Sequence, residues 1–210
     1  MIVVDIETSG LYPWKHSILS IGAVDFLNPE RQFYGECRLR DGAEIDQKAL
    51  KINGFTQDDI TKDKKQSEKD LLKNFIEWVR QSEDYIFGGH NIGGFDLAFI
   101  NYAADRYNLD KFWGHRCVDL HTVVYLLYLR GIFNSENILK NKKSNIDSDC
   151  IMRLCGIPPE PKPHNALNGA KWEAEAFSRF IFGKSLLSDF SSYPIPEYLK
   201  IPHHPIQANI

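Results

Sequence analysis

Short apolar runs separated by turn residues fill the first forty positions of the chain. Ile2–Val4 is a run typical of a strand buried on both faces. Residues 18–26 and 31–39 also read as strands, with the turn residues Asn28–Glu30 between them. The pattern therefore predicts one buried strand followed by an antiparallel hairpin.

Helical periodicity takes over further along the chain. Ser67 with Asp70 three residues later resembles a capping box, and apolar residues recur behind it at helical spacing. Residues 58–70 mix both charge signs and are expected to form ordinary surface. The remaining predicted elements are strands at 85–87 and 117–120 and helices at 95–103, 123–129 (buried), 147–155 and after 164. Strands that come first and then alternate with helices predict a mixed α/β sheet, with the later strands parallel to the first.

Prolines divide the last third of the chain. A proline-rich loop at 157–163 restricts the backbone just before His164 and the final helix. Four more prolines follow after residue 190. We therefore expect one domain over residues 1–185 and an irregular, proline-containing tail over 186–210.

Composition narrows the class of protein. A hydrophobic content of 43% is enough for a core, and no run approaches the length of a membrane span. The first residues lack the layout of a signal peptide, so we expect a cytoplasmic protein with no membrane partner and four reduced cysteines. A net charge of −3 counts mildly against avid, non-specific nucleic-acid binding. It does not exclude an enzyme whose acidic residues hold metal ions.

Three acidic residues and one histidine stand at predicted element ends. Asp5 and Glu7 follow the first apolar run and, two residues apart, point to the same side of a strand, where a cation between them would offset their repulsion. A solvated strand end is the alternative. Asp96 stands at a helix start and His164 before the last helix. Taken singly, each is better explained by a structural role, as an N-cap and as a structural histidine.

In combination these residues resemble a known family. Residues 4–11 (Val-Asp-Ile-Glu-Thr-Ser-Gly-Leu), 90–96 (His-Asn-Ile-Gly-Gly-Phe-Asp) and 164–167 (His-Asn-Ala-Leu) are similar to the three motifs of the DEDDh 3′→5′ exonucleases, the group of polymerase proofreading subunits and RNase T. Residues 18–24 and 53–56 match its second strand and a small helical turn. The resemblance implies an RNase H-like five-stranded sheet in the order 3-2-1-4-5 with one antiparallel strand.

The resemblance also implies a mechanism. Two divalent ions, Mg²⁺ or Mn²⁺, would be held by Asp5, Glu7 and Asp96, with Asp5 bridging them, and His164 would take a proton from the attacking water. The implied partners are 3′ ends of single-stranded DNA or RNA, from which 5′-mononucleotides are released. Homodimers occur in parts of the family, and protein partners are unknown. The residues implied to contact the terminal nucleotide are Thr8, Leu11, His90, Asn91 and Phe95, of which Leu11 and Phe95 fit a core position equally well.

One position departs from the family pattern. The fourth acid belongs five residues after the histidine, where this chain has Gly169. Three explanations stay open: a natural or engineered loss of activity, a pseudo-exonuclease that binds ends without cutting, or rescue by Glu173. Glu173 is one helical turn (about 5.4 Å) further along, which requires a backbone adjustment or a bridging water. We expect Gly169→Asp to raise exonuclease activity on a single-stranded oligonucleotide with Mn²⁺ present.

Three functional hypotheses remain. The first is a 3′→5′ exonuclease, impaired at its fourth acid. The second is a non-catalytic module that binds nucleic-acid ends, and the third is a phosphodiesterase of short oligonucleotides. Mononucleotide release separates the first from the second, and comparison of a dinucleotide with a twenty-mer separates the third.

Overall fold

The computed structural model describes residues 1–134 and 138–200. The chain forms two compact units, each made of two segments. The first unit consists of residues 1–122 and 160–174, and the second of residues 123–159 and those from 175 onward.

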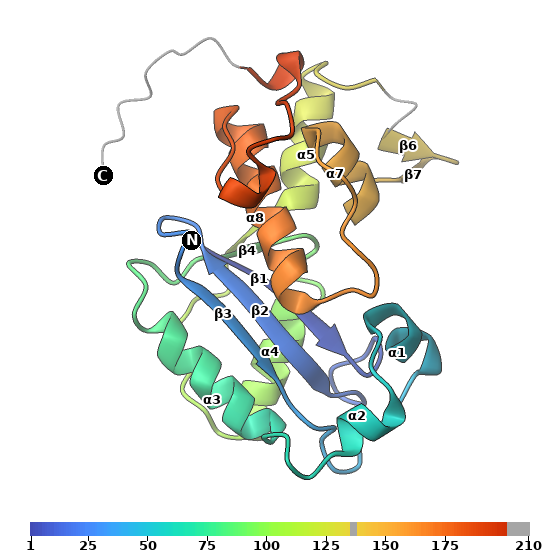
Figure 1. The fold of residues 1–210 in the computed structure, drawn as a ribbon, viewed down its shortest axis with the longest axis vertical. Coiled ribbons are helices and arrows are strands. Elements are labelled where there is room, and N and C mark those ends of the chain that lie inside the picture. Colours follow the sequence, from blue (N-terminus) through green and yellow to red (C-terminus); the bar gives the residue numbers. More distant parts are fainter. Residues whose placement is uncertain (135–137, 201–210) are drawn as a thin grey trace. The chain divides into compact units, whose positions relative to one another are not determined.

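A five-stranded sheet forms the centre of the first unit, in the order β3-β2-β1-β4-β5 (Figure 1). β2 runs antiparallel to both of its neighbours, whereas β1, β4 and β5 are parallel. This confirms the predicted order, the hairpin and the single antiparallel strand. The bounds are β1 (Ile2–Thr8), β2 (Ile18–Asp25), β3 (Gln32–Glu36), β4 (Phe87–Gly89) and β5 (Cys117–Asp119).

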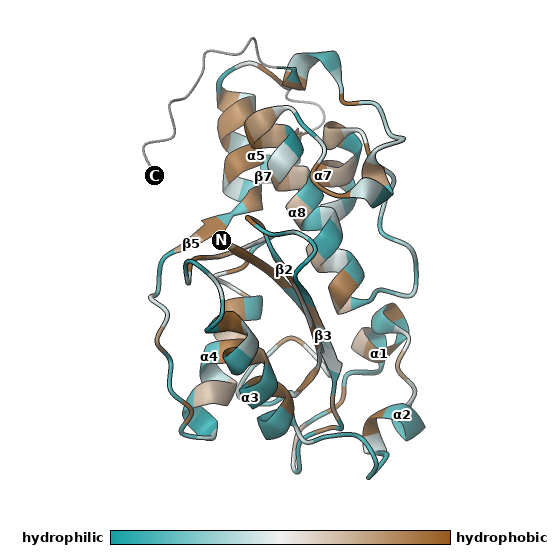
Figure 2. Ribbon diagram, turned by 60° about the vertical axis from the view of Figure 1, so that its left-hand side comes forward, coloured by the Kyte–Doolittle hydropathy of each residue, from teal (hydrophilic) through white to brown (hydrophobic). Residues whose placement is uncertain are grey.

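Helices α3 and α4 cover one face of this sheet (Figure 1). Ile2, Val4 and Ile6 of β1 point to that face and share a buried apolar cluster with residues of both helices. Because side chains alternate along a strand, Asp5 and Glu7 point to the opposite face. Both helices carry mixed hydrophobic and hydrophilic colours in Figure 2, as expected for helices with one buried side. The helices of this unit before β5 are α1 (Gln47–Asn53), α2 (Gln57–Thr61), α3 (Glu68–Val79) and α4 (Asp96–Arg106).

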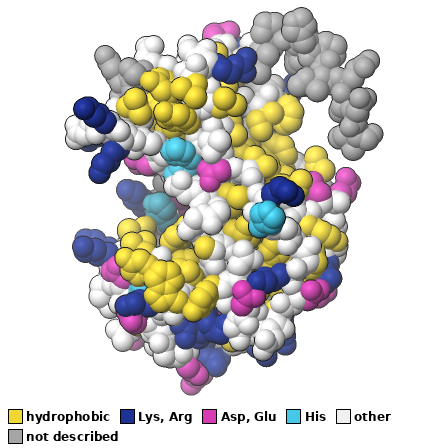
Figure 3. Space-filling view, turned by 180° about the vertical axis from the view of Figure 1, so that it is seen from behind, with side chains coloured by type: hydrophobic (Ala, Val, Ile, Leu, Met, Phe, Trp, Pro, Cys, Tyr) yellow, Lys and Arg dark blue, Asp and Glu magenta, His cyan; other side chains and the backbone are white. Residues whose placement is uncertain are grey.

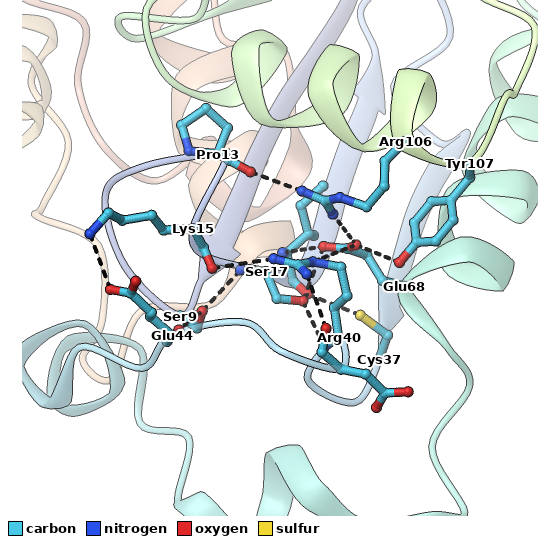
Figure 4. Close-up of polar contacts among 12 residues, drawn as sticks. Ser9, Pro13, Lys15, Ser17, Cys37, Arg40, Glu44, Glu68, Arg106 and Tyr107 are labelled. Atoms are coloured by element: carbon cyan, nitrogen blue, oxygen red, sulfur yellow. Dashed lines mark hydrogen bonds and ion pairs between the residues drawn. The ribbon is translucent and has the colours of Figure 1, made fainter.

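The first residue of α3, Glu68, is a buried anchor and not the surface residue expected from sequence. Its carboxylate accepts hydrogen bonds from Ile18 N (2.8 Å), Arg106 Nη1 (2.7 Å) and the Tyr107 hydroxyl (2.8 Å) (Figure 4). Arg106 also donates to Pro13 O, in the loop between β1 and β2. A buried charge is tolerated when it is paired and fully hydrogen-bonded. Glu68 thereby fixes the loop that carries Leu11.

The second unit is built around another buried ion pair. Arg179, with no exposed surface, donates from Nε to Glu175 Oε1 at 2.6 Å and from its terminal nitrogens to backbone carbonyls, including that of Phe190. Glu175 in turn accepts hydrogen bonds from the backbone N–H groups of Leu186 and Leu187. The elements that lie wholly or partly in this unit are α5 (Leu120–Leu129), β6 (Leu139–Lys140), β7 (Lys143–Ser144), α7 (Ser148–Cys155), α8 (Ala166–Phe182), η1 (Ser188–Phe190) and η2 (Glu197–Leu199).

Two sequence-based expectations about these elements need correction. The apolar helix at 123–129 is not buried all round, because Leu126 and Leu129 are 56% and 65% exposed. The predicted irregular tail contains two short 3₁₀ helices, whose residues Phe190 and Leu199 are buried. Its last ten residues lie outside the described part of the chain, and the predicted domain boundary at 185 stays a prediction.

The distribution of charged and apolar side chains on the surface, the cysteines and the length of the helices can be compared with the expectations from composition. On the face drawn in Figure 3, basic, acidic and hydrophobic side chains are interspersed. All four cysteines are free thiols, as predicted. Within residues 1–134 and 138–200, no helix has the length and hydrophobicity needed to cross a bilayer.

Candidate active site

Asp5 and Glu7 lie on the central strand, on the face of the sheet opposite to α3 and α4. Their cross-strand partners on β2 are Gly22 and Ser20, both small. The missing side chain of Gly22 admits the backbone of Ala166 at the start of the last helix, which thereby lies beside Asp5. In this register Asp5 and Glu7 lie on the same side of the strand, as predicted from their spacing.

Asp96 joins these two acids from the start of α4. The N-cap position of α4 is held by Phe95, so Asp96 is the first residue inside the helix and not the N-cap. Its Oδ1 accepts a hydrogen bond from Ile6 N at 3.1 Å, the backbone group between Asp5 and Glu7. The side chain is only 4% exposed. Asp96 is thus fixed against the segment of β1 that carries the other two acids.

Like charges and burial perturb all three carboxyl groups. Burial, then the charges of Asp96, Glu173, Glu7 and Glu160, raise the pKa of Asp5 well above its ordinary value. Burial, Glu160 and Asp96 raise the pKa of Glu7 to about 8. Burial raises that of Asp96 to about 7, against the opposing effect of its backbone hydrogen bonds. Gathered carboxylates that disfavour each other's ionised form are stabilised by a cation.

The donor set fits a hard divalent ion such as Mg²⁺ or Mn²⁺, because it consists of carboxylate oxygens. In the present side-chain conformation, no three acidic, histidine or cysteine side chains among the described residues already form a metal-binding group. Coordination would therefore require side-chain rotation at this site.

His164 is fixed by two partners. Its backbone N–H donates to Ile52 O at 3.1 Å, and its Nδ1 lies 3.3 Å from Glu160 Oε2. The other oxygen of Glu160 accepts from Asn165 N at 3.0 Å, so the carboxylate cannot turn away. A hydrogen on Nδ1 that is bonded to Glu160 leaves Nε2 as the nitrogen able to accept a proton. Sequence reasoning missed Glu160; its position between prolines four residues before His164 was the available signal.

An apolar cavity of about 300 Å³ lies beside Glu7. Leu11 and Phe95 both line it, together with Ile52 of α1. Leu11 is 63% exposed and is therefore not a core residue, whereas Phe95 also packs against the core cluster. The hydroxyl of Thr8 is buried and donates to Gly10 O at 2.6 Å, which closes the turn after β1.

His90 and Asn91 directly follow β4, the strand that pairs with β1. The His90 backbone N–H donates to Glu173 Oε2 at 3.2 Å, and its ring stacks on that of His121 with 6.3 Å between centroids. Asn91 has a positive φ of 55°, which asparagine tolerates better than most residues, and its side chain is exposed. The two residues thus shape a turn whose backbone faces Glu173 of α8.

Gly169 lies in the first turn of α8, directly against Asp5. The helix begins with Asn165 Oδ1 accepting from Leu167 N and Asn168 N, as an N-capping side chain does. A Cβ added at Gly169 would lie 2.2 Å from Asp5 Oδ2. The fourth-acid position therefore faces the site, as the motif predicts, but it has no space for a side chain while Asp5 keeps this conformation.

Comparisons with known proteins give a consistent result. The RNase_T family model, described as an exonuclease, matches residues 2–177. The 3′–5′ DNA exonuclease Cap18 of Escherichia coli is 30% identical over 183 residues, covering 84% of this chain and 88% of that protein. Among solved structures, the nuclease domain of 3′hExo bound to rAMP, a DEDDh family member, aligns with a TM-score of 0.65 at 17% identity over 89% of this chain and 93% of that one. Exonuclease I of E. coli in complex with a dT13 oligonucleotide aligns at 0.67 and 18%, over 85% of this chain and 40% of that one. This chain belongs to the RNase_T exonuclease family.

Proposed function

We propose that the chain is a metal-dependent 3′→5′ exonuclease that releases 5′-mononucleotides from single-stranded nucleic-acid ends. The observation that carries this proposal is the meeting of Asp5, Glu7 and Asp96 at one segment of β1, tied by the hydrogen bond from Ile6 N to Asp96 Oδ1. Family membership supplies the reaction class. When two divalent ions are bound, they supply charge neutralisation of the phosphate and activation of water.

The protein's own residues divide the remaining work. Asp5, Glu7 and Asp96 would hold the ions. His164 accepts the proton of the attacking water at Nε2, while Glu160 keeps the ring oriented through Nδ1. The leaving group is the 3′-oxygen of the shortened strand, so the released nucleotide keeps its 5′-phosphate.

The terminal base is placed in the apolar cavity beside Glu7. A base can pack against Phe95, and Leu11 projects from its loop at the rim, where it can separate the last base from the one before it. This puts the last phosphodiester next to the carboxylates. Cap18 is described as acting on DNA, and 3′hExo was solved with a ribonucleotide, so both sugars belong in the test.

The experiment is digestion of 5′-labelled single-stranded DNA and RNA twenty-mers with Mg²⁺, Mn²⁺ or EDTA. We expect a ladder that shortens from the 3′ end, release of 5′-mononucleotides, and no reaction in EDTA or with Asp5→Asn. Persistence of the intact oligonucleotide with both metals, from folded protein, would reject the proposal.

Gly169 favours one second candidate, an end-binding protein without activity. In that case the wild-type protein should bind a 3′-hydroxyl end more tightly than a 3′-phosphate end and release no mononucleotide at high Mn²⁺. The same digestion, combined with a fluorescence-anisotropy titration of both oligonucleotides, distinguishes the two candidates.

A further inference from the structure

Gly169 is part of a close contact between α8 and the sheet. Besides the 2.2 Å approach to Asp5 Oδ2, a Cβ at Gly169 would lie 2.7 Å from Asp5 Cγ. On the neighbouring strand, a Cβ at Gly22 would lie 2.1 Å from the backbone carbonyl carbon of Ala166, in the same helical turn. Two glycines, one on each partner, thus permit the helix to contact β1 and β2 directly. The contact at Gly22 is with helix backbone and demands glycine, whereas the contact at Gly169 is with the Asp5 side chain and lasts as long as Asp5 keeps this conformation.

Glu173 projects from the same face of α8, one turn later. Its side chain is only 7% exposed, and Oε2 accepts from His90 N at 3.2 Å at the end of β4. Gly89 leaves space for it, since a Cβ there would lie 3.2 Å from Glu173 Oε2. The hydrogen bond to Oε2 fixes the carboxylate of Glu173 beside the end of β4.

Glu173 interacts electrostatically with residues proposed to hold the metal ions. Glu173 is the second-largest neighbouring charge that raises the pKa of Asp5. Burial and then Asp96 raise the pKa of Glu173 itself. Its carboxylate therefore belongs to the same electrostatic cluster as Asp5 and Asp96.

We propose that Glu173 replaces the missing fourth acid and is the α8 carboxylate that binds the divalent ion, the helix being brought close to β1 by Gly169 and Gly22. This inference rests on the proposed function. It implies that the chain carries a rearranged site and is active, and it reverses the expected effect of an aspartate at position 169.

The test compares Glu173→Gln with the wild-type protein. Glutamine keeps an oxygen acceptor for His90 N and removes the negative charge. Mn²⁺ binding is measured by calorimetry and by the loss of the free-ion electron paramagnetic resonance signal, and mononucleotide release is measured on the same samples. We expect Mn²⁺ affinity to fall at least about tenfold, and release to fall with it, while metal-free stability is kept or increased because a buried charge is removed. Glu83→Gln, at an exposed position, is the matched control and should behave as wild type.

Gly169→Asp provides the second arm. Because Asp5 must move to admit the new side chain, we expect this variant to bind Mn²⁺ no more tightly than wild type and to be no more active. Wild-type Mn²⁺ affinity and activity in Glu173→Gln would overturn the inference, as would a gain of both in Gly169→Asp. If wild type neither binds Mn²⁺ nor cleaves, and Asp5→Asn changes nothing, the proposed function itself fails. A wild-type protein that cleaves with Glu173 unimportant leaves the proposed function intact.

Discussion

Replacing the ionisable carboxyl group of Glu7 by an amide should stabilise the metal-free protein at neutral pH. Burial, Glu160 and Asp96 raise the pKa of Glu7 from 4.5 to about 8 in the folded state. The unfolded chain releases this proton above about pH 4.5, while the folded protein retains it up to about pH 8. The folded state therefore binds more protons across this window, and its stability falls as pH rises.

The size of the stability difference follows from the gap between the pKa of Glu7 in the unfolded chain and in the folded protein. At pH 7 the group lies about 2.5 pH units above its unfolded pKa and is still mostly protonated when folded. At about 1.4 kcal/mol per unit, ionisation stabilises the unfolded chain by about 3 kcal/mol relative to the folded protein. Glu7→Gln cannot ionise and avoids this loss. We expect the variant to exceed wild type in unfolding free energy by about 3 kcal/mol at pH 7, and the difference to shrink to less than about 1 kcal/mol at pH 5.

The assay is urea unfolding in EDTA at pH 5, 6 and 7, followed by circular dichroism. Glu30→Gln, in the exposed turn between β2 and β3, controls for loss of one charge and should track wild type. Saturating Mn²⁺ should reverse the ranking, because wild type regains through metal binding what Glu7→Gln cannot. Parallel stability curves for wild type and Glu7→Gln between pH 5 and 7 would refute the reasoning, since Glu7 would then not be held protonated by its neighbours.

Three further outcomes follow from the contacts described. Glu160→Gln should lower kcat about tenfold or more and change its pH profile, with Mn²⁺ affinity less affected, because His164 loses the carboxylate that orients its ring; an unchanged profile would show that Glu160 does not act through His164. Leu11→Ala should raise KM for a single-stranded oligonucleotide severalfold without loss of stability, since Leu11 is largely exposed; an unchanged KM would remove it from the base site. Glu68→Ala should cost about 3–5 kcal/mol in urea unfolding by leaving Arg106 unpaired; a cost below about 1 kcal/mol would show that the network is not a stabilising anchor.

The sheet and the first acids could be predicted because local pattern decides them. A short apolar run with Asp5 and Glu7 two residues apart indicates both the strand and the shared face, whatever the rest of the chain does. The turn at 28–30 similarly specifies the hairpin. The order of the strands came from the family resemblance, because periodicity carries no information on which strands become neighbours.

Burial of charged residues could not be predicted in the same way. Glu68 reads as one acid in a mixed-charge stretch, and its burial depends on Arg106 and Tyr107, about forty residues away. The role of Glu160 beside His164 likewise depends on the path of the proline-rich loop. In each case the partner that makes burial tolerable is set by tertiary structure, so a window of sequence around the residue contains no sign of it.

The effect of the residue at position 169 depends on its surroundings in the fold as well as on its place in the motif. The motif places an acid there, and its absence suggests a defect. The structure places Gly169 so close to Asp5 that a side chain there would collide with the Asp5 carboxylate in its present conformation. Metal coordination requires oxygen atoms around the ion, and it is indifferent to which helical turn supplies them. If Glu173 supplies the α8 carboxylate, as proposed, the two residues act together, because glycine at 169 lets the helix contact Asp5 and glutamate at 173 provides the oxygen.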